Sequence, residues 1–141
     1  MLVRLVYASR AVAPVSVETL NAILRHAHQH NPAHGITGVL CCSGDVFLQL
    51  LEGSRAAVNR LYARIVADAR HRDVELLAYE AVAERRFSCW AMGQVPRSRL
   101  NPALLLKYSA GTTLDPYSVP GAASLALLDE LAATAAIVGQ A

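Results

Sequence analysis

One glutamine interrupts the most apolar stretch of this chain. Gln49 lies in the segment Phe-Leu-Gln-Leu-Leu at residues 47–51, whose near-continuous apolar character predicts a strand buried on both faces. A primary amide both donates and accepts hydrogen bonds, and one left unpaired in a dry interior costs about 1 to 3 kcal/mol. The fold must therefore bring a polar group to Gln49, and the nature of that group bears directly on function.

The overall composition is that of a compact single-domain protein. The chain has 141 residues, of which 54% are hydrophobic and 17% charged, as in a soluble folded protein rather than a disordered one. A net charge of +2 without any run of Lys or Arg argues against nucleic-acid binding. No apolar run approaches the roughly 18 residues of a membrane span. Arg4 interrupts the apolar amino terminus, so we expect no signal peptide and a cytoplasmic location.

The three cysteines predict neither a disulfide framework nor a metal pair. Cys41 and Cys42 are adjacent and Cys89 is distant, which matches neither kind of spacing. Free cysteines are commonly buried as small hydrophobic residues. We therefore expect all three to lie in the core.

The apolar periodicity of the first 95 residues predicts five strands and two helices. Ser16 is a plausible N-cap for a helix that ends at Asn31, and Ser54 is a plausible N-cap for a helix over residues 55–69. The predicted strands cover residues 2–9, 36–42, 46–52, 74–82 and 87–95. The order βαββαββ is that of a ferredoxin-like α+β fold with one additional strand.

The composition changes after residue 95 and becomes rich in leucine. A short helix is predicted from Asn101-Pro102 to about residue 108, and another from Pro120 through Leu125, Leu128, Leu131 and Ala135. Both are too short and apolar to be stable alone, so we expect them to cover the sheet face opposite the first two helices. Residues 1–95 would then form the main domain, and residues 96–141 a helical cap.

Several polar residues converge in this layout. Tyr7 is in phase with apolar neighbours on the first strand, Asn31 closes the first helix, and Gln49 lies on the third strand. Arg64 and Asp68 are four residues apart on the second helix and are expected to pair. These groups would surround a slot between the two helices, suited to a flat heteroaromatic ligand. The expected apolar walls of the slot are Ile23, Leu24, Leu61 and Ile65.

The same residues also have a purely structural explanation. Tyr7 and Gln49 could bond each other, and Asn31 could cap its helix. Three amide or hydroxyl groups in one apolar pocket nevertheless exceed what packing alone requires.

The motifs that carry these residues resemble the BLUF family, the blue-light sensors that bind FAD. The resemblance runs in order and with matching spacing through residues 5–9 (Leu-Val-Tyr-Ala-Ser), 31–38 (Asn-Pro-Ala-His-Gly-Ile-Thr-Gly), 47–53 (Phe-Leu-Gln-Leu-Leu-Glu-Gly), 70–71 (Arg-His) and 87–92 (Phe-Ser-Cys-Trp-Ala-Met). It implies a photoreceptor that binds FAD noncovalently and is not an enzyme.

The resemblance also implies roles for individual residues of the switch. Tyr7 would donate an electron and a proton to the photoexcited flavin, and Gln49 would switch between Tyr7 and the flavin ring edge. Trp90 and Met92, expected to share one face of the fifth strand, would exchange places near Gln49 and pass the signal on.

Cofactor contacts follow from the same resemblance. Asn31 would hold the carbonyl and N3 side of the flavin, and Arg64, steadied by Asp68, would lie near the other carbonyl. Arg70 and His71 would lie near the phosphate and adenine end. Ala27 stands where many members carry a small hydroxyl residue facing the flavin, which could alter the spectrum or the recovery rate without preventing binding.

The tail extends the resemblance to short, stand-alone members of the PixD type through Lys-Tyr-Ser-Ala-Gly-Thr-Thr-Leu at residues 107–114. This implies homo-oligomers and a partner protein that resembles a response regulator.

Other functions remain open from the sequence alone. His26, His28, His30 and His34 are close in sequence, and the i, i+4 spacing of His26 and His30 suits zinc, but no carboxylate or cysteine joins them at ligand spacing. A small acyl-phosphate hydrolase would need an anion-binding loop after the first strand, where no glycine occurs. An RNA-binding sheet would need exposed aromatic residues on its central strands.

Overall fold

A twisted five-stranded sheet forms the centre of the molecule. The computed structural model describes residues 1–134 and 136–139. The strands lie in the order β4-β1-β3-β2-β5, with β2 and β5 parallel and the other neighbours antiparallel. Their bounds are β1 Leu2–Ala11, β2 Thr37–Ser43, β3 Val46–Ser54, β4 His71–Val82 and β5 Gly93–Val95.

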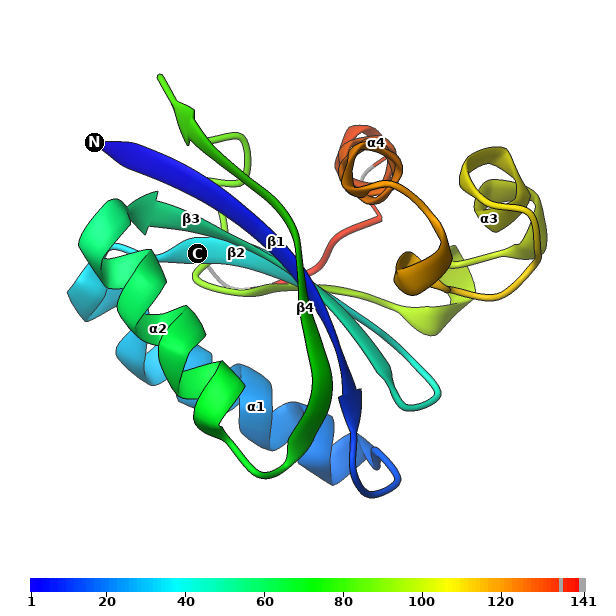
Figure 1. Ribbon diagram of the computed structural model, residues 1–141, viewed down its shortest axis with the longest axis horizontal. Coiled ribbons are helices and arrows are strands. Elements are labelled where there is room, and N and C mark those ends of the chain that lie inside the picture. Colours follow the sequence, from blue (N-terminus) through cyan, green and yellow to red (C-terminus); the bar gives the residue numbers. More distant parts are fainter. Residues whose placement is uncertain (135, 140–141) are drawn as a thin grey trace.

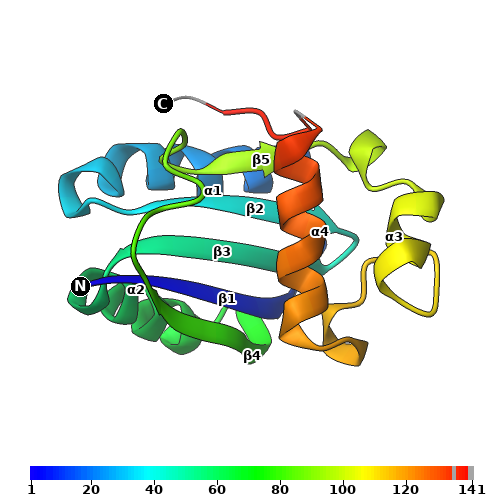
Figure 2. The ribbon, with the colours of Figure 1, turned by 90° about the horizontal axis from the view of Figure 1, so that it is seen from above.

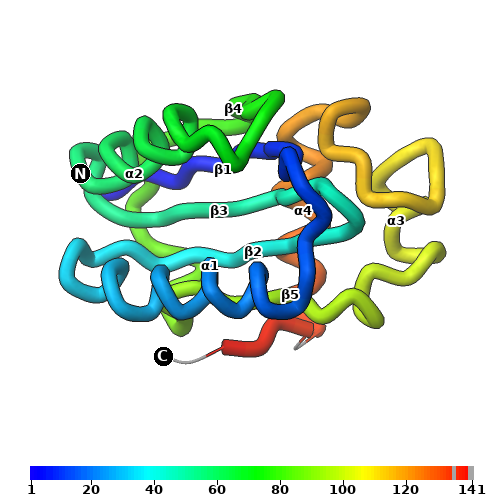
Figure 3. Tube along the Cα trace, turned by 90° about the horizontal axis from the view of Figure 1, so that it is seen from below, coloured from blue at the N-terminus to red at the C-terminus, as the bar shows by residue number. Residues whose placement is uncertain are grey.

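Helices cover both faces of this sheet. The helices α1 (Val17–His30) and α2 (Arg55–Ala67) lie side by side on one face (Figures 1 and 3). On the other face α4 (Gly121–Ala133) crosses the strands, and α3 (Pro102–Tyr108) packs beside it beyond the end of the sheet (Figure 2). Short 3₁₀ turns occupy Pro32–His34, Arg97–Arg99 and Pro116–Ser118. This is the predicted α+β arrangement.

The apolar strands are explained by two separate hydrophobic cores. Leu5 and Tyr7 of β1 pack under α1 and α2, whereas Val6 between them packs in the core formed with α4. Successive side chains of a strand point to opposite faces, so a strand covered on both sides must be apolar at nearly every position. Gln49 departs from this rule, as do the other buried polar residues of β1 and β3, which are Arg4, Ser9 and Glu52.

The predicted helix starts are confirmed by their caps. Ser16 Oγ accepts a hydrogen bond from the Thr19 N–H at 3.1 Å, and Ser54 Oγ accepts one from the Ala57 N–H at 3.2 Å. Asn101 caps α3 in the same way. The described part of α4 ends at Ala133, so the expectation that this helix reaches residue 135 lies outside the described residues.

The prediction of a long fifth strand was wrong, because β5 begins at Gly93 rather than at residue 87. Side chains bind the backbone groups that a sheet ladder would use. The Glu52 carboxylate accepts the N–H groups of Arg86 and Phe87, and Asn31 Nδ2 donates to the Ala91 carbonyl at 2.9 Å. The segment before β5 is therefore an irregular loop.

This loop separates the two residues that were expected to share a strand face. Met92 is 1% exposed and lies in the core under α1 and α2, whereas Trp90 packs against the core on the α4 side. Cys89, in the same loop, is exposed and not buried as predicted, while Cys41 and Cys42 are buried in β2.

The carboxyl-terminal segment returns to the sheet. The Gln94 N–H donates to the Val138 carbonyl at 2.6 Å, and the Val138 N–H donates to the Gln94 carbonyl at 2.9 Å. Val138 thus forms an isolated bridge with Gln94 of β5, on the side that β2 leaves free. Among the described helices, none has the length and apolar character needed to cross a membrane.

Candidate functional site

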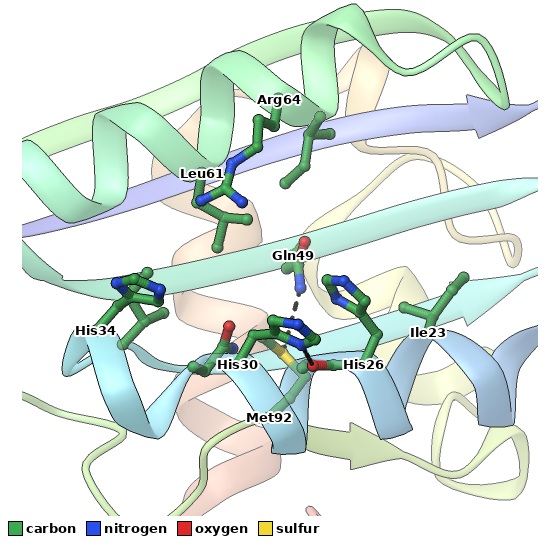
Figure 4. Close-up of a pocket in the computed structure, with 12 residues that line it drawn as sticks. Ile23, His26, His30, His34, Gln49, Leu61, Arg64 and Met92 are labelled. Atoms are coloured by element: carbon green, nitrogen blue, oxygen red, sulfur yellow. Dashed lines mark hydrogen bonds between the residues drawn. The ribbon is translucent and has the colours of Figure 1, made fainter.

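A cavity of about 110 Å³ lies between α1 and α2 (Figure 4). Its walls include Ile23 and Ala27 from α1 and Leu61 and Ile65 from α2. The predicted slot therefore exists, although Leu24 is buried beneath the helix and is not among the residues that line it. The remaining lining residues are His26, His30, Asn31, His34, Ile36, Gln49, Arg64 and Met92.

Gln49 lies on the sheet side of this cavity, and both ends of its amide are hydrogen-bonded. Tyr7 lies directly opposite Gln49 in the pairing of β1 with β3, and the Tyr7 hydroxyl donates to Gln49 Oε1. Gln49 Nε2 donates to Met92 Sδ at 3.2 Å. A thioether sulfur is a weak acceptor, so the amide has a strong partner at its oxygen and a weak one at its nitrogen. The nitrogen can therefore exchange its partner at little cost.

Tyr7 is kept as a neutral phenol. Its side chain is 2% exposed, and burial, together with the neighbouring Tyr62 phenol, raises the pKa of Tyr7 well above its usual range. The two tyrosine rings lie 5.5 Å apart between centroids. Tyr7 therefore carries its proton at every physiological pH and holds it against Gln49.

Asn31 connects the end of α1 to the loop before β5. Its backbone N–H donates to the Ala27 carbonyl as the last turn of the helix, and its buried side chain donates to the Ala91 carbonyl. His28, one helical turn earlier, contacts the next carbonyl, that of Met92, through Nε2 at 3.1 Å. The loop that places Met92 against Gln49 is thus fixed by α1.

The predicted pair of Arg64 and Asp68 is not formed in the described part of the chain. Asp68 follows the last residue of α2 with an extended backbone, and its carboxylate binds the backbone N–H and the guanidinium of Arg70, with Nη2 at 2.6 Å. Those bonds lower the pKa of Asp68 to about 2. Helical i, i+4 geometry stops at the end of a helix, and Arg64 instead points from α2 toward the slot, which it lines (Figure 4).

Arg70 and His71 lie outside the cavity lining. His71 begins β4, where its Nδ1 lies 3.0 Å from Ser9 Oγ and its ring meets the edge of Phe47. Burial lowers the pKa of His71. Asp68, Arg70 and His71 all lie within four residues of the end of α2. None of the three is among the residues that line the slot.

The sequence interpretation missed a row of histidines along the slot. His26 and His30 lie one turn apart on α1, His34 ends the 3₁₀ turn Pro32–His34, and all three line the slot (Figure 4). The sequence shows this i, i+4, i+8 spacing, but from the sequence alone it suggests only a metal site. Within the described residues, no three His, Cys, Asp or Glu side chains are placed to hold a metal ion.

The residues suit a flat ring system with polar edges. Aliphatic walls face each other across the slot, and hydrogen-bonding groups of both senses meet at its inner end through Asn31 and Gln49. A cavity of about 150 Å³ holds a ligand the size of benzene, so a fused ring system must displace side chains of this cavity. Arg64 and His30 are exposed and can turn outward.

Comparison with known proteins identifies one protein family. Residues 2–93 match the family model described as "BLUF: Sensors of blue-light using FAD". Photoactivated adenylate cyclase subunit beta of Euglena gracilis is 40% identical over 92 residues, which are 64% of this chain and 11% of that protein. The chain thus spans about a tenth of the length of this curated relative.

Solved structures agree with the sequence relatives. The dark-state structure of BlrB, a BLUF protein, superposes with a TM-score of 0.80 and 34% identity, covering 95% of this chain and 96% of that one. BlrP1 of Klebsiella pneumoniae, solved with FMN and cyclic diGMP, gives a TM-score of 0.64 and 36% identity over 73% of this chain and 27% of its own.

Proposed function

Since the chain belongs to the BLUF family of blue-light sensors that use FAD, we propose that Tyr7, Gln49 and Met92 form its light-operated switch. The family match confirms the resemblance drawn from the motifs. The protein is a flavin-binding photoreceptor, and its domain is a sensor rather than a catalyst.

The bound flavin supplies blue-light absorption and, when excited, an acceptor for an electron and a proton. Tyr7 supports the donor role because its buried phenol keeps its proton and is already hydrogen-bonded to Gln49. Gln49 supports the switch role because its amide ends differ in hydrogen-bond sense. Rotation or tautomerisation of that amide inverts what it presents to Tyr7 and to Met92.

We assign the inner contacts of the flavin ring to groups that line the slot. Ile23 provides an apolar wall, Asn31 and Gln49 provide polar groups at the inner end, and Arg64 closes the slot from α2. Asp68, Arg70 and His71 are assigned to the outer, nucleotide end of the cofactor. Their position directly after α2 supports this assignment.

The hydrogen bond from Tyr7 to Gln49 carries the proposal, and replacement of the amide tests it. Gln49→Leu keeps the volume and apolar surroundings of the position but removes both hydrogen-bonding ends. We expect the variant to bind FAD yet to lose the light-induced red shift in a light-minus-dark absorption spectrum. Gln29→Leu, the same change on the exposed side of α1, serves as the matched control. An undiminished shift in Gln49→Leu would refute the switch role.

We further propose that the signal leaves through β5 and the carboxyl-terminal segment. Met92, which contacts Gln49, immediately precedes Gly93, and the next residue, Gln94, bonds to Val138. There is little free space here, because a Cβ atom on Gly93 would lie 2.6 Å from Ile137 Cγ2. A displacement of Met92 is therefore passed on to residues 136–139. In this proposal residues 1–95 sense light and residues 96–141 act as the output cap.

The receiving component is proposed to be a separate protein of response-regulator type or a rearranged homo-oligomer. The resemblance of residues 107–114 to PixD-type chains supports this proposal. Light scattering coupled to gel filtration, performed in the dark and under blue light, tests it. A monomer in both states would reject the homo-oligomer.

A further inference from the structure

Three consecutive carbonyl groups before β5 each accept a hydrogen bond from another element of the fold. The pairs are the Gly38 N–H with Trp90 at 3.1 Å, Asn31 Nδ2 with Ala91 at 2.9 Å, and His28 Nε2 with Met92 at 3.1 Å. Because a carbonyl only accepts, His28 Nε2 carries the proton of this last bond. Two of the three donors are thus side chains of α1 and its C-cap.

The third carbonyl belongs to the residue whose sulfur contacts the switch amide. Gln49 Nε2 donates to Met92 Sδ at 3.2 Å (Figure 4). Met92 is 1% exposed, so its carbonyl cannot take water as a partner while the residue keeps its place. A buried carbonyl is costly to leave unpaired. The position of the sulfur against Gln49 therefore depends on the hydrogen bond from His28.

His28 is the donor of the three that can be released most easily. The Gly38 N–H is part of the backbone of β2, and Asn31 is 5% exposed and also closes α1 with its backbone. His28 is half-buried, and its side chain can turn toward water, which then replaces the carbonyl as its partner. A movement of the loop before β5 therefore breaks this bond first.

The Met92 carbonyl also lies next to the carboxyl-terminal segment. A Cβ atom on Gly139 would lie 3.3 Å from the Met92 carbonyl oxygen and 3.0 Å from Trp90 Cδ1. This carbonyl is therefore a point at which α1, the loop before β5 and the carboxyl-terminal segment meet.

We propose that His28 is a positioning residue of the light switch. Its hydrogen bond to the Met92 carbonyl holds the sulfur at Gln49 in the dark, is given up in the lit state, and re-forms on the return to the dark state. This inference rests on the proposed switch of Tyr7, Gln49 and Met92. It adds a residue that is not among the described residues lining the flavin slot.

The rate of dark recovery then depends on the His28 donor. Since the bond re-forms before the barrier of recovery is crossed, its removal raises that barrier. The net strength of one ordinary hydrogen bond corresponds to a recovery about two- to tenfold slower.

Infrared spectroscopy can observe the Met92 carbonyl directly, because the chain has only two methionines, Met1 and Met92. Methionine labelled with ¹³C at the carbonyl identifies their bands in a light-minus-dark spectrum of the FAD-loaded protein. A carbonyl that loses a hydrogen bond absorbs at higher frequency, so we expect the Met92 band to move upward under blue light. In Met92→Leu only Met1 carries the label, which assigns its band.

Three variants separate the donor from the bulk of the side chain. His28→Leu removes the donor, and we expect a red shift under blue light, a Met92 band at higher frequency already in the dark, and the slower recovery. His28→Gln has an amide N–H at about the reach of Nε2 and should restore both the band and the recovery rate. Gln29→Leu makes the corresponding change at an exposed neighbour on α1 and should alter neither.

The possible results separate this inference from the function on which it rests. A Met92 band that stays in place in a wild-type protein with a normal red shift overturns the role of His28 and needs no variant. Recovery of His28→Leu at the wild-type rate overturns it too. Equal slowing in His28→Gln or in Gln29→Leu would attribute the effect to packing or to α1 in general, and also overturns it. A wild-type protein that binds FAD without any red shift would overturn the proposed switch itself.

Discussion

At the scale of single residues, the position of Tyr7 opposite Gln49 explains how a buried amide is tolerated. The register of β1 and β3 places the two side chains on the same face, and the hydroxyl satisfies the amide oxygen. The amide nitrogen has only the sulfur of Met92. An amide held firmly at one end and loosely at the other is suited to switching.

The raised pKa of Tyr7 predicts a loss of stability in alkali. Below about pH 10 the Tyr7 phenol is protonated in the folded and in the unfolded chain, so its ionisation takes nothing from the stability. Above pH 10 the unfolded chain releases the proton and the folded chain retains it, so stability falls as the pH rises. Urea unfolding of the flavin-free protein should show wild type losing about 1 kcal/mol more than Tyr7→Phe between pH 9 and pH 11. Equal losses would show that Tyr7 ionises freely.

The same variant tests the photochemical role of Tyr7. Tyr7→Phe retains the ring that packs against Tyr62 but lacks the hydroxyl. We expect it to bind FAD and to show no red-shifted state under blue light. Tyr62→Phe, which alters the other ring of the pair, should still photocycle. Normal cycling in Tyr7→Phe would contradict the donor role.

At the scale of structural elements, one buried carboxylate holds the loop before β5. Glu52 of β3 is fully buried and accepts hydrogen bonds from Arg4 Nε at 2.8 Å and from the N–H groups of Arg86 and Phe87. Arg4 in turn reaches the more exposed Glu80 on β4. This network joins three strands to the loop that positions Met92.

Removal of the Glu52 charge should be costly, because it leaves Arg4 buried without its main partner. We expect Glu52→Gln to lower the free energy of unfolding by about 3 to 5 kcal/mol. Glu80→Gln removes the half-exposed partner of the same arginine and should cost about 1 kcal/mol or less. Urea unfolding measures both. Similar costs for the two variants would show that burial does not decide the strength of this network.

A methyl group at Gly93 should disturb the link between β5 and the carboxyl-terminal segment. The new Cβ would lie 2.6 Å from Ile137 Cγ2 and 3.1 Å from the Trp90 ring, so the segment must move. We expect Gly93→Ala to lose about 1 to 3 kcal/mol of stability and to speed hydrogen exchange at Val138. Trp90 is the single tryptophan, so its fluorescence reports the displacement.

Gly111→Ala provides the control for this prediction, because no atom lies within 4 Å of the added methyl group. It should leave both exchange and fluorescence unchanged. If the proposed output route is correct, blue light should also speed exchange at Val138 in the wild type. Equal exchange in light and dark would argue against that route.

At the scale of the whole molecule, the sheet separates a ligand-binding side from a packing side. The core under α1 and α2 is interrupted by the cavity, whereas the core under α4 contains the larger group of buried residues. A ligand that fills the cavity therefore completes the first core. At the proposed flavin site, the cofactor would therefore also be a structural component of this core.

Removal of FAD should accordingly lower the thermal stability. At a free concentration of 100 times the dissociation constant, FAD adds about 2.7 kcal/mol of stability, which corresponds to about 5 to 10 °C in the midpoint for a chain of this size. Differential scanning calorimetry with and without FAD measures the change. NAD has the same adenine and diphosphate but a different ring, and should give little shift. An unchanged midpoint with saturating FAD would contradict a role in the core.

Local sequence patterns determined much of the fold. The N-cap residues Ser16 and Ser54 specify where α1 and α2 begin. The helical spacing of the apolar residues that follow agrees with these starts, because both signals act within one or two turns of the helix. The isolated Gln49 marked the site, because a buried amide requires a partner wherever the chain folds. The two C-terminal helices were also predicted from their leucine pattern.

Only the tertiary structure decided the features that depend on residues distant in sequence. Glu52, Asn31 and Gly38 bind the backbone before β5, so Met92 and Trp90 face different cores instead of sharing a strand face. Periodicity predicts which backbone groups could pair in a sheet, but not that side chains from other elements will take them. The charge around the slot was likewise decided by the packing of α1 beside α2, which brings the histidine row opposite Arg64.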